Sequence, residues 1–317
     1  MQRLAIALAA SIAVSPALAA PPAGNPGGGG GAGGGGAPPA STNCRVSMMA
    51  SPGSWVIQGF DPFDSGNAEG VYSITYTNTG TGECRFSPVF ELDQPPFGLR
   101  GGTGRPIGYA LIDITNSLDV TPRAGQSQRR SSQSQIVLAP NASTTVMYRL
   151  AVAADDVRDH GEFGQTVFVE AQDSAFRAVG GTQVSLGINV LPSARIGLAG
   201  AYAVSDGRAL VDLGELRSGP AAVPLNLRVN STGTYSLSVR SANSGRLRLA
   251  DTGWSVPYSL GVGGSTVTLA GGTTTLDGPQ GAGYRRDALP LHFVIGTVDD
   301  LRAGTYRDTL TISVAPR

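Results

Sequence analysis

The chain of 317 residues contains no lysine, so every basic side chain is an arginine. A lysine-free chain cannot form a Schiff base, a Ser–Lys catalytic dyad or a lysine-based isopeptide cross-link. Histidine is nearly absent as well, and His160 and His292 leave few candidates for general-base catalysis. His160 and Glu162 lack a third ligand at a matching spacing. We therefore expect a protein that is not an enzyme and that holds no metal or cofactor.

The chain also lacks an excess of charge and a long apolar segment. Basic and acidic side chains number 23 each. A nucleic-acid partner would need a basic excess, so we expect no binding to DNA or RNA. After residue 19, no stretch approaches the roughly 18 uninterrupted apolar residues of a membrane-spanning helix. We expect the exported chain to be soluble.

Cysteine is limited to Cys44 and Cys84. An even pair in an exported protein indicates a disulfide, and two unpaired buried thiols are the alternative that an oxidising compartment disfavours. A bridge that closes a loop of about 40 residues stabilises a fold by roughly 4 kcal/mol on the chain-entropy model.

The first 43 residues are typical of a processed terminus. Arg3 precedes a short apolar run at residues 4–14, and Ala17 and Ala19 form a small-x-small cleavage motif, so residues 1–19 are predicted to be a signal peptide. Residues 20–43 consist mainly of glycine, proline and alanine. This composition cannot bury enough apolar surface to offset its chain entropy and predicts a flexible tail.

From Cys44 onward the sequence consists of short alternating runs separated by Gly, Asn, Asp, Ser and Pro, as at residues 71–76, 144–150, 225–229 and 309–314. A period of two at this spacing indicates antiparallel strands with one buried face. No long amphipathic helix is evident. The sequence predicts an all-β fold of two immunoglobulin-like β-sandwich domains, residues 44–191 and 195–317.

An internal repeat supports the two-domain prediction. Residues 155–169 align with residues 299–312 when one residue is skipped, and both contain an acidic turn, a glycine, an aromatic residue and a Thr that precedes an alternating strand. Residues 74–80 similarly resemble residues 227–233. Two sandwiches of one type explain the repeat. Chance similarity among Thr-rich strands is the alternative, and the shared Asp-Asp-x-Arg makes it the weaker one.

The two repeats differ in the sequence that comes after each of them. A further strand at residues 182–191 comes after the first, whereas the sequence ends at residue 317 soon after the second. We therefore expect the C-terminal sandwich to lack its last strand, which leaves an unpaired edge and an apolar groove that another chain can fill by β-strand addition. In the alternative, residues 196–203 change sheets and close the gap. The residues expected to line the groove are Leu225, Leu227, Val229, Leu310, Ile312 and Val314.

Several short motifs resemble spore coat protein U-like domains. These are Cys-Arg-Val at residues 44–46 followed by residues 59–63, strands at residues 213–216 and 256–260, and the Ala-Gly-x-Tyr-x-Asp-Thr ending within residues 301–312. The middle of the first domain departs from the family pattern. The resemblance implies a subunit of an archaic chaperone–usher pilus that passes through the periplasm to a cell-surface fibre. The implied partners are a periplasmic chaperone, an outer-membrane usher and an adjacent pilin subunit that donates a strand.

The tail suggests a place in such a fibre. Residues 20–43 contain no large apolar side chain, and proline cannot donate a ladder hydrogen bond, so this segment cannot serve as a donor strand. A subunit that receives but does not donate belongs at the tip, with the first domain binding an unknown surface or receptor. Aromatics on Gly/Pro-rich loops could bind apolar material or sugar rings, although core aromatics are the alternative. The candidate tip-binding residues are Trp55, Phe60, Phe63, Phe97, Leu99 and Tyr109.

Two rival functions fit two sandwich domains. A periplasmic chaperone anchors its subunit with an Arg–Lys pair, which a lysine-free chain cannot supply. A free-standing secreted coat or carbohydrate-binding protein would have two complete sandwiches, so the completeness of the second domain distinguishes it from a fibre subunit.

Overall fold

The computed structural model describes residues 3–10, 43–64, 68–101, 105–122, 128–129, 135–250, 252–281 and 283–317, with the backbone alone for 3–10 and 128–129. These residues form β-strands and loops, with a 3-10 turn at η2 (Ala154–Asp156) and no α-helix in the described part of the chain. The predicted all-β sandwich class is confirmed. The predicted cleavage motif at residues 17–19 and the predicted tail, apart from Asn43, lie outside the described residues.

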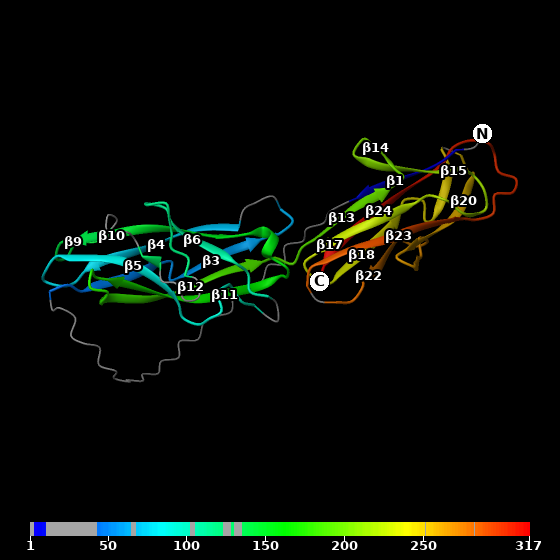
Figure 1. Ribbon diagram of the computed structural model, residues 1–317. Coiled ribbons are helices and arrows are strands. Elements are labelled where there is room, and N and C mark those ends of the chain that lie inside the picture. Colours follow the sequence, from blue (N-terminus) through cyan, green and yellow to red (C-terminus); the bar gives the residue numbers. More distant parts are fainter. Residues whose placement is uncertain are drawn as a thin grey trace. The chain divides into compact units, whose positions relative to one another are not determined.

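The chain forms two compact units (Figure 1). The N-terminal unit is Ala17–Leu191, and the C-terminal unit is Pro192–Arg317 together with Met1–Pro16. No helix in the described residues is long and apolar enough to cross a membrane.

The N-terminal unit consists of two sheets, with strand orders β2-β4-β10-β6-β7 and β3-β12-β11-β5-β8, and with β9 paired to β5. The bounds are β2 (Val46–Ser51), β3 (Ser54–Phe60), β4 (Ala68–Asn78), β5 (Cys84–Leu92), β6 (Tyr109–Asp113), β7 (Leu118–Asp119), β8 (Gln128–Arg129), β9 (Ile136–Leu138), β10 (Ser143–Val152), β11 (Gly161–Gln172) and β12 (Ala178–Val190).

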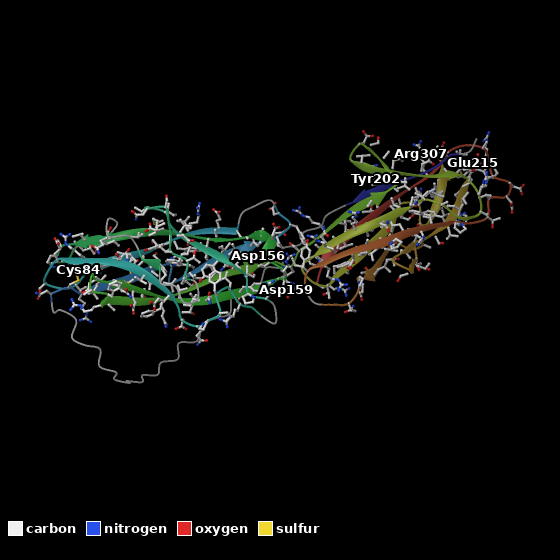
Figure 2. The ribbon with its side chains drawn as sticks, in the orientation of Figure 1. Cys84, Asp156, Asp159, Tyr202, Glu215 and Arg307 are labelled. Atoms are coloured by element: carbon white, nitrogen blue, oxygen red, sulfur yellow. A yellow bond between two sulfur atoms is a disulfide. The ribbon has the colours of Figure 1, made fainter. Side chains whose placement is uncertain are left out.

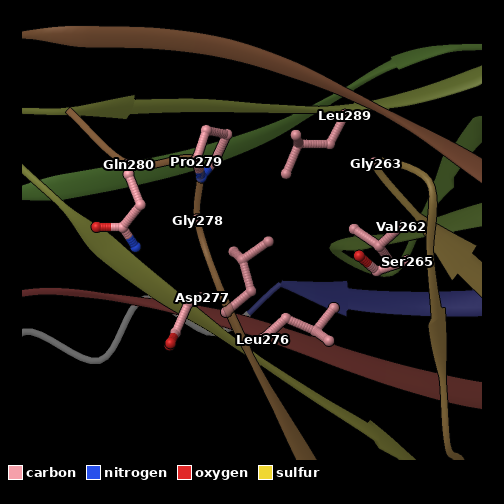
Figure 3. Close-up of a pocket in the computed structure, with 10 residues that line it drawn as sticks. Val262, Gly263, Ser265, Leu276, Asp277, Gly278, Pro279, Gln280 and Leu289 are labelled. Atoms are coloured by element: carbon pink, nitrogen blue, oxygen red, sulfur yellow. The ribbon is translucent and has the colours of Figure 1, made fainter.

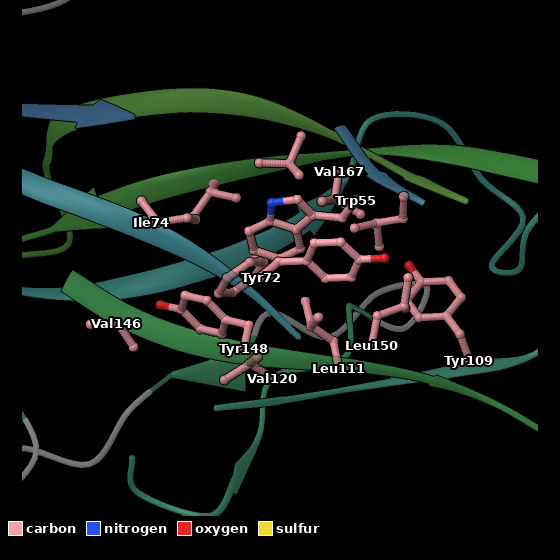
Figure 4. Close-up of a cluster of buried hydrophobic side chains, with 14 of the residues drawn as sticks. Trp55, Tyr72, Ile74, Tyr109, Leu111, Val120, Val146, Tyr148, Leu150 and Val167 are labelled. Carbon is pink, nitrogen blue, oxygen red and sulfur yellow. The ribbon is translucent and has the colours of Figure 1, made fainter. Parts of the chain in front are cut away.

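The alternating sequence places one face of each strand in the core. On β4, Tyr72, Ile74 and Tyr76 are buried, while the residues between them are more exposed. The ring of Trp55 packs against the rings of both Tyr72 and Tyr148 from the other sheet, with centroid distances of 5.4 and 5.6 Å (Figure 4). Aromatic contacts of this kind hold the two sheets together because large rings bury much apolar area with few rotatable bonds.

The disulfide predicted between Cys44 and Cys84 is present, with the two Cα atoms 5.0 Å apart. It joins the residues just before β2 to the first residue of β5. Because β2 and β5 belong to different sheets, the bridge links the two layers of the N-terminal sandwich.

In the C-terminal unit one continuous sheet folds over its core, because β19 pairs with both β20 and β24. The order is β13-β17-β23-β20-β19-β24-β1-β15-β14, with β22 on β18, β18 on β24, β21 on β20 and β16 on β23. The bounds are β1 (Arg3–Ala10), β13 (Ala194–Gly200), β14 (Ala203–Ser205), β15 (Arg208–Glu215), β16 (Gly219–Pro220), β17 (Leu225–Ser231), β18 (Tyr235–Ser241), β19 (Arg246–Leu249), β20 (Ser255–Val262), β21 (Ser265–Val267), β22 (Thr273–Asp277), β23 (Arg285–Ile295) and β24 (Tyr306–Pro316).

The sequence repeat corresponds to equivalent strands in the two units. Its strand segments are β11 and β24, and they occupy the same place in matching orders: β3-β12-β11-β5 in the N-terminal unit and β15-β1-β24-β18 in the C-terminal unit. The other layers also match, as β2-β4-β10-β6 and β13-β17-β23-β20. The duplication inferred from sequence is thus a duplication of topology, in which β1 takes the place of β12.

Candidate functional site

The candidate site is the strand position between β24 and β15, here called the slot. One edge of β24 pairs with β18 and β19, and the other pairs with β1 over residues 306–312. On the opposite side of the slot, β15 pairs with β1 and with β14. In the described residues, no strand of Pro192–Arg317 enters the slot. Residues 3–10 alone, within the described part of the chain, hydrogen-bond to both of its walls.

The equivalent position in the N-terminal unit is filled by the unit's own strand. There β12 follows β11 in a hairpin, runs antiparallel to it and pairs in parallel with β3. The internal pairing predicted for residues 182–191 is therefore confirmed. In the C-terminal unit the direction is reversed, because β1 runs parallel to β24 and antiparallel to β15.

The alternative in which residues 196–203 close the gap is wrong. The strand in this region, β13, pairs with β17 along its whole length, from Ala194 with Ser231 to Gly200 with Leu225. It lies at the far end of the strand order from β15. Its backbone hydrogen bonds are directed to β17, so they do not complete the edge of β24.

All six residues predicted to line the groove are buried in a single core cluster. Leu310 and Ile312 lie on the slot wall β24, opposite β1, whereas Val314 lies beyond the last residue that pairs with β1. The other three, Leu225, Leu227 and Val229, belong to β17 in the facing layer. Their role in accepting a strand stays a prediction.

The sequence reasoning missed the second wall. Val211 and Leu213 on β15 are buried and adjoin the slot. Val211 and Leu213 lie on either side of Asp212, which indicates a strand although Leu210 is apolar as well. Nothing local to the sequence says that β15 and β24 flank the same gap. Tyr306 and Asp308, also buried on β24, complete the wall.

Asp308 is a charged residue at the core face of β24, only 3% exposed. Its carboxylate accepts hydrogen bonds from the hydroxyls of Ser241 (2.5 Å) and Tyr258 (2.7 Å). It also accepts the backbone N–H groups of Asn243 (3.0 Å) and Thr309 (2.7 Å). Because each partner is a donor, these four contacts satisfy the buried carboxylate.

This network joins three segments of the core, β24, β20 and the turn after β18. Burial, reinforced by the hydrogen bond to Asp308, raises the pKa of Tyr258 far above its usual value. The repeat places Gln165 of β11 at the position of Asp308, and Gln165 accepts a hydrogen bond from the Tyr109 hydroxyl at 3.1 Å. Each unit therefore has a polar residue on the equivalent strand that binds a tyrosine across the core.

The solvent side of the slot carries charges on both walls. Arg307 of β24 and Glu215 of β15 are exposed, and Figure 2 labels both in the C-terminal unit. Next to Arg307, the Tyr306 hydroxyl donates a hydrogen bond to the backbone carbonyl of Arg302 at 2.9 Å. This contact ties β24 to the loop that precedes it.

The predicted tip-binding residues are mostly in the core of the N-terminal unit. Trp55 and Leu99 are fully buried, and Phe60 and Tyr109 are 7% and 6% exposed, so these four are core residues, which was the alternative to loop-borne binding aromatics. They are buried because they lie on strands or bridges whose core face they occupy. Phe63 and Phe97 are half-buried. A role of any of the six in binding stays a prediction.

The structure brings two of these residues together. The ring centroids of Phe97 and Tyr109 lie 4.7 Å apart. Both residues border a shallow hollow of about 440 Å³, and Asp156 forms part of its wall. This hollow is at the end of the unit where Val190 pairs with Gly161 and the chain continues to residue 192. Figure 2 shows Cys84 at the opposite end from Asp156 and Asp159. At the Cys84 end, Phe176 in the β11–β12 turn is 71% exposed.

A hollow of about 380 Å³ occurs in the C-terminal unit (Figure 3). Leu237, Leu276, Leu289 and Val262 form much of its lining. Since β18 separates β22 from β24, the hollow is not part of the slot. Among the described residues, no group of three or more His, Cys, Asp or Glu side chains is arranged to hold a metal ion.

Comparison with known proteins finds similar folds among solved structures. The CsuC–CsuE chaperone–tip adhesion subunit pre-assembly complex of Acinetobacter baumannii matches with 14% sequence identity and a TM-score of 0.43. The match covers 84% of this chain and 99% of that chain. The CupB6 tip adhesin of Pseudomonas aeruginosa matches with 10% identity, 86% and 100% coverage and a TM-score of 0.34. CfaE, the adhesive subunit of the CFA/I fimbria of enterotoxigenic Escherichia coli, matches with 11% identity, 84% and 99% coverage and a TM-score of 0.29.

The three are described as a chaperone–tip adhesion subunit complex, a tip adhesin and the adhesive subunit of a fimbria. No protein-family model and no curated protein sequence matches the chain. The resemblance to spore coat protein U-like domains therefore stays a prediction.

Proposed function

We propose that this chain is an adhesive subunit of a bacterial surface fibre assembled by the chaperone–usher route. In this proposal the C-terminal unit accepts a β-strand from another chain in the slot between β24 and β15. A periplasmic chaperone supplies the strand in transit, an outer-membrane usher exports the subunit, and an adjacent pilin subunit supplies the strand in the fibre. The N-terminal unit carries the adhesive surface.

One observation carries the proposal: the N-terminal sandwich fills its slot with β12, whereas Pro192–Arg317 provides no strand for the equivalent slot among the described residues. If residues 1–19 are removed as predicted, β24 and β15 each retain an edge of unpaired backbone groups above an apolar core. Such an edge is a template for strand addition. The buried residues Val211, Leu213, Leu310 and Ile312 would contact the inward side chains of the added strand.

Placement at the fibre tip follows from the composition of the tail, which offers no alternating apolar residues to a neighbour. Gold-labelled antibody against residues 44–191 should mark fibre ends and not shafts. Label distributed along the shaft would contradict the tip placement, while leaving strand acceptance intact.

Strand acceptance can be tested on the mature chain, residues 20–317, by hydrogen exchange with and without a synthetic donor. The probe is a peptide of residues 182–190, TQVSLGINV, which contains the sequence that pairs with β11 in the N-terminal unit. We expect it to slow exchange in β24 and β15. A control peptide with serine at the positions of Val184, Leu186 and Ile188 should have no effect. If the amides of β24 and β15 exchange as slowly without the peptide as with it, the slot is not open and the proposal fails.

Adhesion can be assigned to an end of the N-terminal unit with two matched variants. Phe97→Ser alters the hollow near Tyr109, and Phe176→Ser alters the exposed turn at the Cys84 end. Attachment of cells that carry either variant to apolar and glycan-coated surfaces should fall for only one of them. Loss with Phe97→Ser supports the predicted tip-binding set, and loss with Phe176→Ser assigns the contact to the opposite end.

A further inference from the structure

Residues 3–10 play two parts in this protein. The sequence predicts them to be part of the signal peptide, with Arg3 as its positive start and residues 4–10 in its apolar run, and the structure pairs them with both walls of the slot. We propose that this segment is a provisional strand of the C-terminal sandwich, which closes the slot in the precursor and opens it when the signal peptide is cleaved. The inference rests on the proposed function, because it assigns a first, intramolecular occupant to the same slot.

The register of β1 agrees with the alternation of its sequence. Arg3–Ala10 reads RLAIALAA, so a larger apolar residue at every second position alternates with alanine. Each of the larger residues is opposite a buried residue of β24, and each intervening alanine is opposite an exposed or half-buried one. Residues directly opposite each other in a sheet share a face. The pairs with buried residues are Leu4 with Tyr306, Ile6 with Asp308 and Leu8 with Leu310.

The N-terminal unit provides an independent comparison. Phe163, Gln165 and Val167 of β11 are the repeat equivalents of Tyr306, Asp308 and Leu310. Their partners on β12 are the branched apolar residues Ile188, Leu186 and Val184. The two slots therefore have branched apolar residues at the same three positions, although β12 and β1 run in opposite directions. The strand β12 of the N-terminal unit and the predicted signal-peptide strand β1 therefore both place branched apolar residues opposite the core-facing positions of the neighbouring strand.

Export alone does not explain this pattern. A secretory signal needs a positive start, a short apolar run and a small-residue cleavage site, none of which requires a period of two. A period of two is what a strand with one buried face requires. The alternation in residues 4–9 therefore points to a strand role in addition to the export role.

The physical consequence is a difference between precursor and mature chain. In the precursor, β24 and β15 have their backbone groups paired with β1, and the apolar core is covered at this edge. Cleavage removes both effects in one step. The open edge then appears only outside the cytoplasm. There, strand-donating partners are present, and the edge can no longer pair with unrelated cytoplasmic chains.

The test compares two oxidised, refolded proteins by hydrogen exchange. One is the precursor made uncleavable by Ala19→Arg, and the other is the mature chain, residues 20–317. We expect the amides of β24 and β15 to exchange at least roughly tenfold more slowly in the precursor than in the mature chain. In the precursor their hydrogen bonds to β1 open only when a larger part of the unit unfolds. A peptide of residues 3–10 with a polar C-terminal tag, added to the mature chain, should restore the protection. The control peptide RLLIAAAA has the same composition without alternation and should not.

Two precursor variants separate the register from general apolarity. Ile6→Asp places a charge opposite buried Asp308, and Ala7→Asp places the same charge opposite half-buried Thr309. The first should abolish the protection of β24, and the second should retain it. Equal effects of the two variants would overturn the inference, since the pairing would then not follow the observed register.

The outcomes also separate this inference from the proposed function. If the peptide of residues 182–190 protects β24 in the mature chain but the peptide of residues 3–10 does not, the slot accepts strands and the signal segment is not its occupant. If neither peptide protects β24, both proposals fail. If the peptide of residues 3–10 protects β24 and RLLIAAAA does not, the inference is supported.

Discussion

The hydroxyl of Tyr258 donates a 2.7 Å hydrogen bond to the carboxylate of Asp308, and both residues are buried. Asp308 lies on the slot wall β24, and Tyr258 lies on β20, which pairs with β23 in the facing layer. The bond therefore crosses the core of the C-terminal sandwich close to the edge that lacks a strand of its own. It ties β24 to the facing layer at the strand whose other edge pairs with β1.

Removing this bond should destabilise the C-terminal unit. Tyr258→Phe leaves the buried carboxylate with one donor fewer, and we expect a loss of about 1.5–3 kcal/mol in the free energy of unfolding. Urea unfolding followed by the fluorescence of Trp254, in a Trp55→Phe background, measures it. Tyr202→Phe is the control, because Tyr202 is 39% exposed. Equal midpoints for the two variants would show that the bond contributes nothing.

The pKa of Tyr258 predicts a loss of stability at alkaline pH. Its pKa is raised in the folded chain by burial and by the Asp308 carboxylate. The unfolded chain releases the phenolic proton near pH 10, while the folded chain retains it. The contribution of Tyr258 to the free energy of unfolding is therefore fully present below about pH 10 and is lost as the pH rises beyond it. Tyr258→Phe should make the unfolding free energy of the C-terminal unit fall less steeply between about pH 10 and 11, just above the ordinary tyrosine pKa; an unchanged slope would assign the dependence to other groups.

Reduction of the Cys44–Cys84 disulfide should destabilise only the N-terminal unit. The bridge closes a loop with a sequence separation of 40 residues, and its loss is expected to cost roughly 4 kcal/mol on the entropy model. The chain contains two tryptophans, one in each unit, so a Trp254→Phe variant reports on the N-terminal unit and a Trp55→Phe variant reports on the C-terminal unit. With reductant, the transition reported by Trp55 should move to lower urea, whereas that reported by Trp254 should not. A common shift would mean that the two units unfold together.

Gly180 should not tolerate a side chain. A Cβ at this position of β12 would overlap the carbonyl oxygen of Val46 on β2, so the two strands would have to separate. We expect Gly180→Ala to lower the free energy of unfolding of the N-terminal unit by about 1–3 kcal/mol. Gly53 has no atom within 4 Å of the place that a Cβ would take and no left-handed backbone, so Gly53→Ala is the matched control. Equal stability of the two variants would contradict this close approach of β12 and β2.

Periodicity and residue chemistry allowed the strands and the bridge to be predicted. Alternation marks a strand because its period of two separates core from solvent, as it does on β4 and β24. An exported pair of cysteines indicates a bridge, and Cys44 and Cys84 form one. The aromatic candidates were less predictable, because the same aromatic residue suits a binding loop or a core. Trp55 and Tyr109 belong to the core since their strands turn them inward.

The sequence by itself determined that the chain folds as two related all-β sandwiches, because strand period, turn residues and the internal repeat are local properties. It also indicated that a further strand follows the first repeat, at residues 182–191. Only the tertiary structure decided that β15 is the second wall of the slot and that residues 3–10 pair with it. Those pairings join residues about 200 positions apart or more, and such contacts depend on the order of strands in the sheet, which no local pattern specifies.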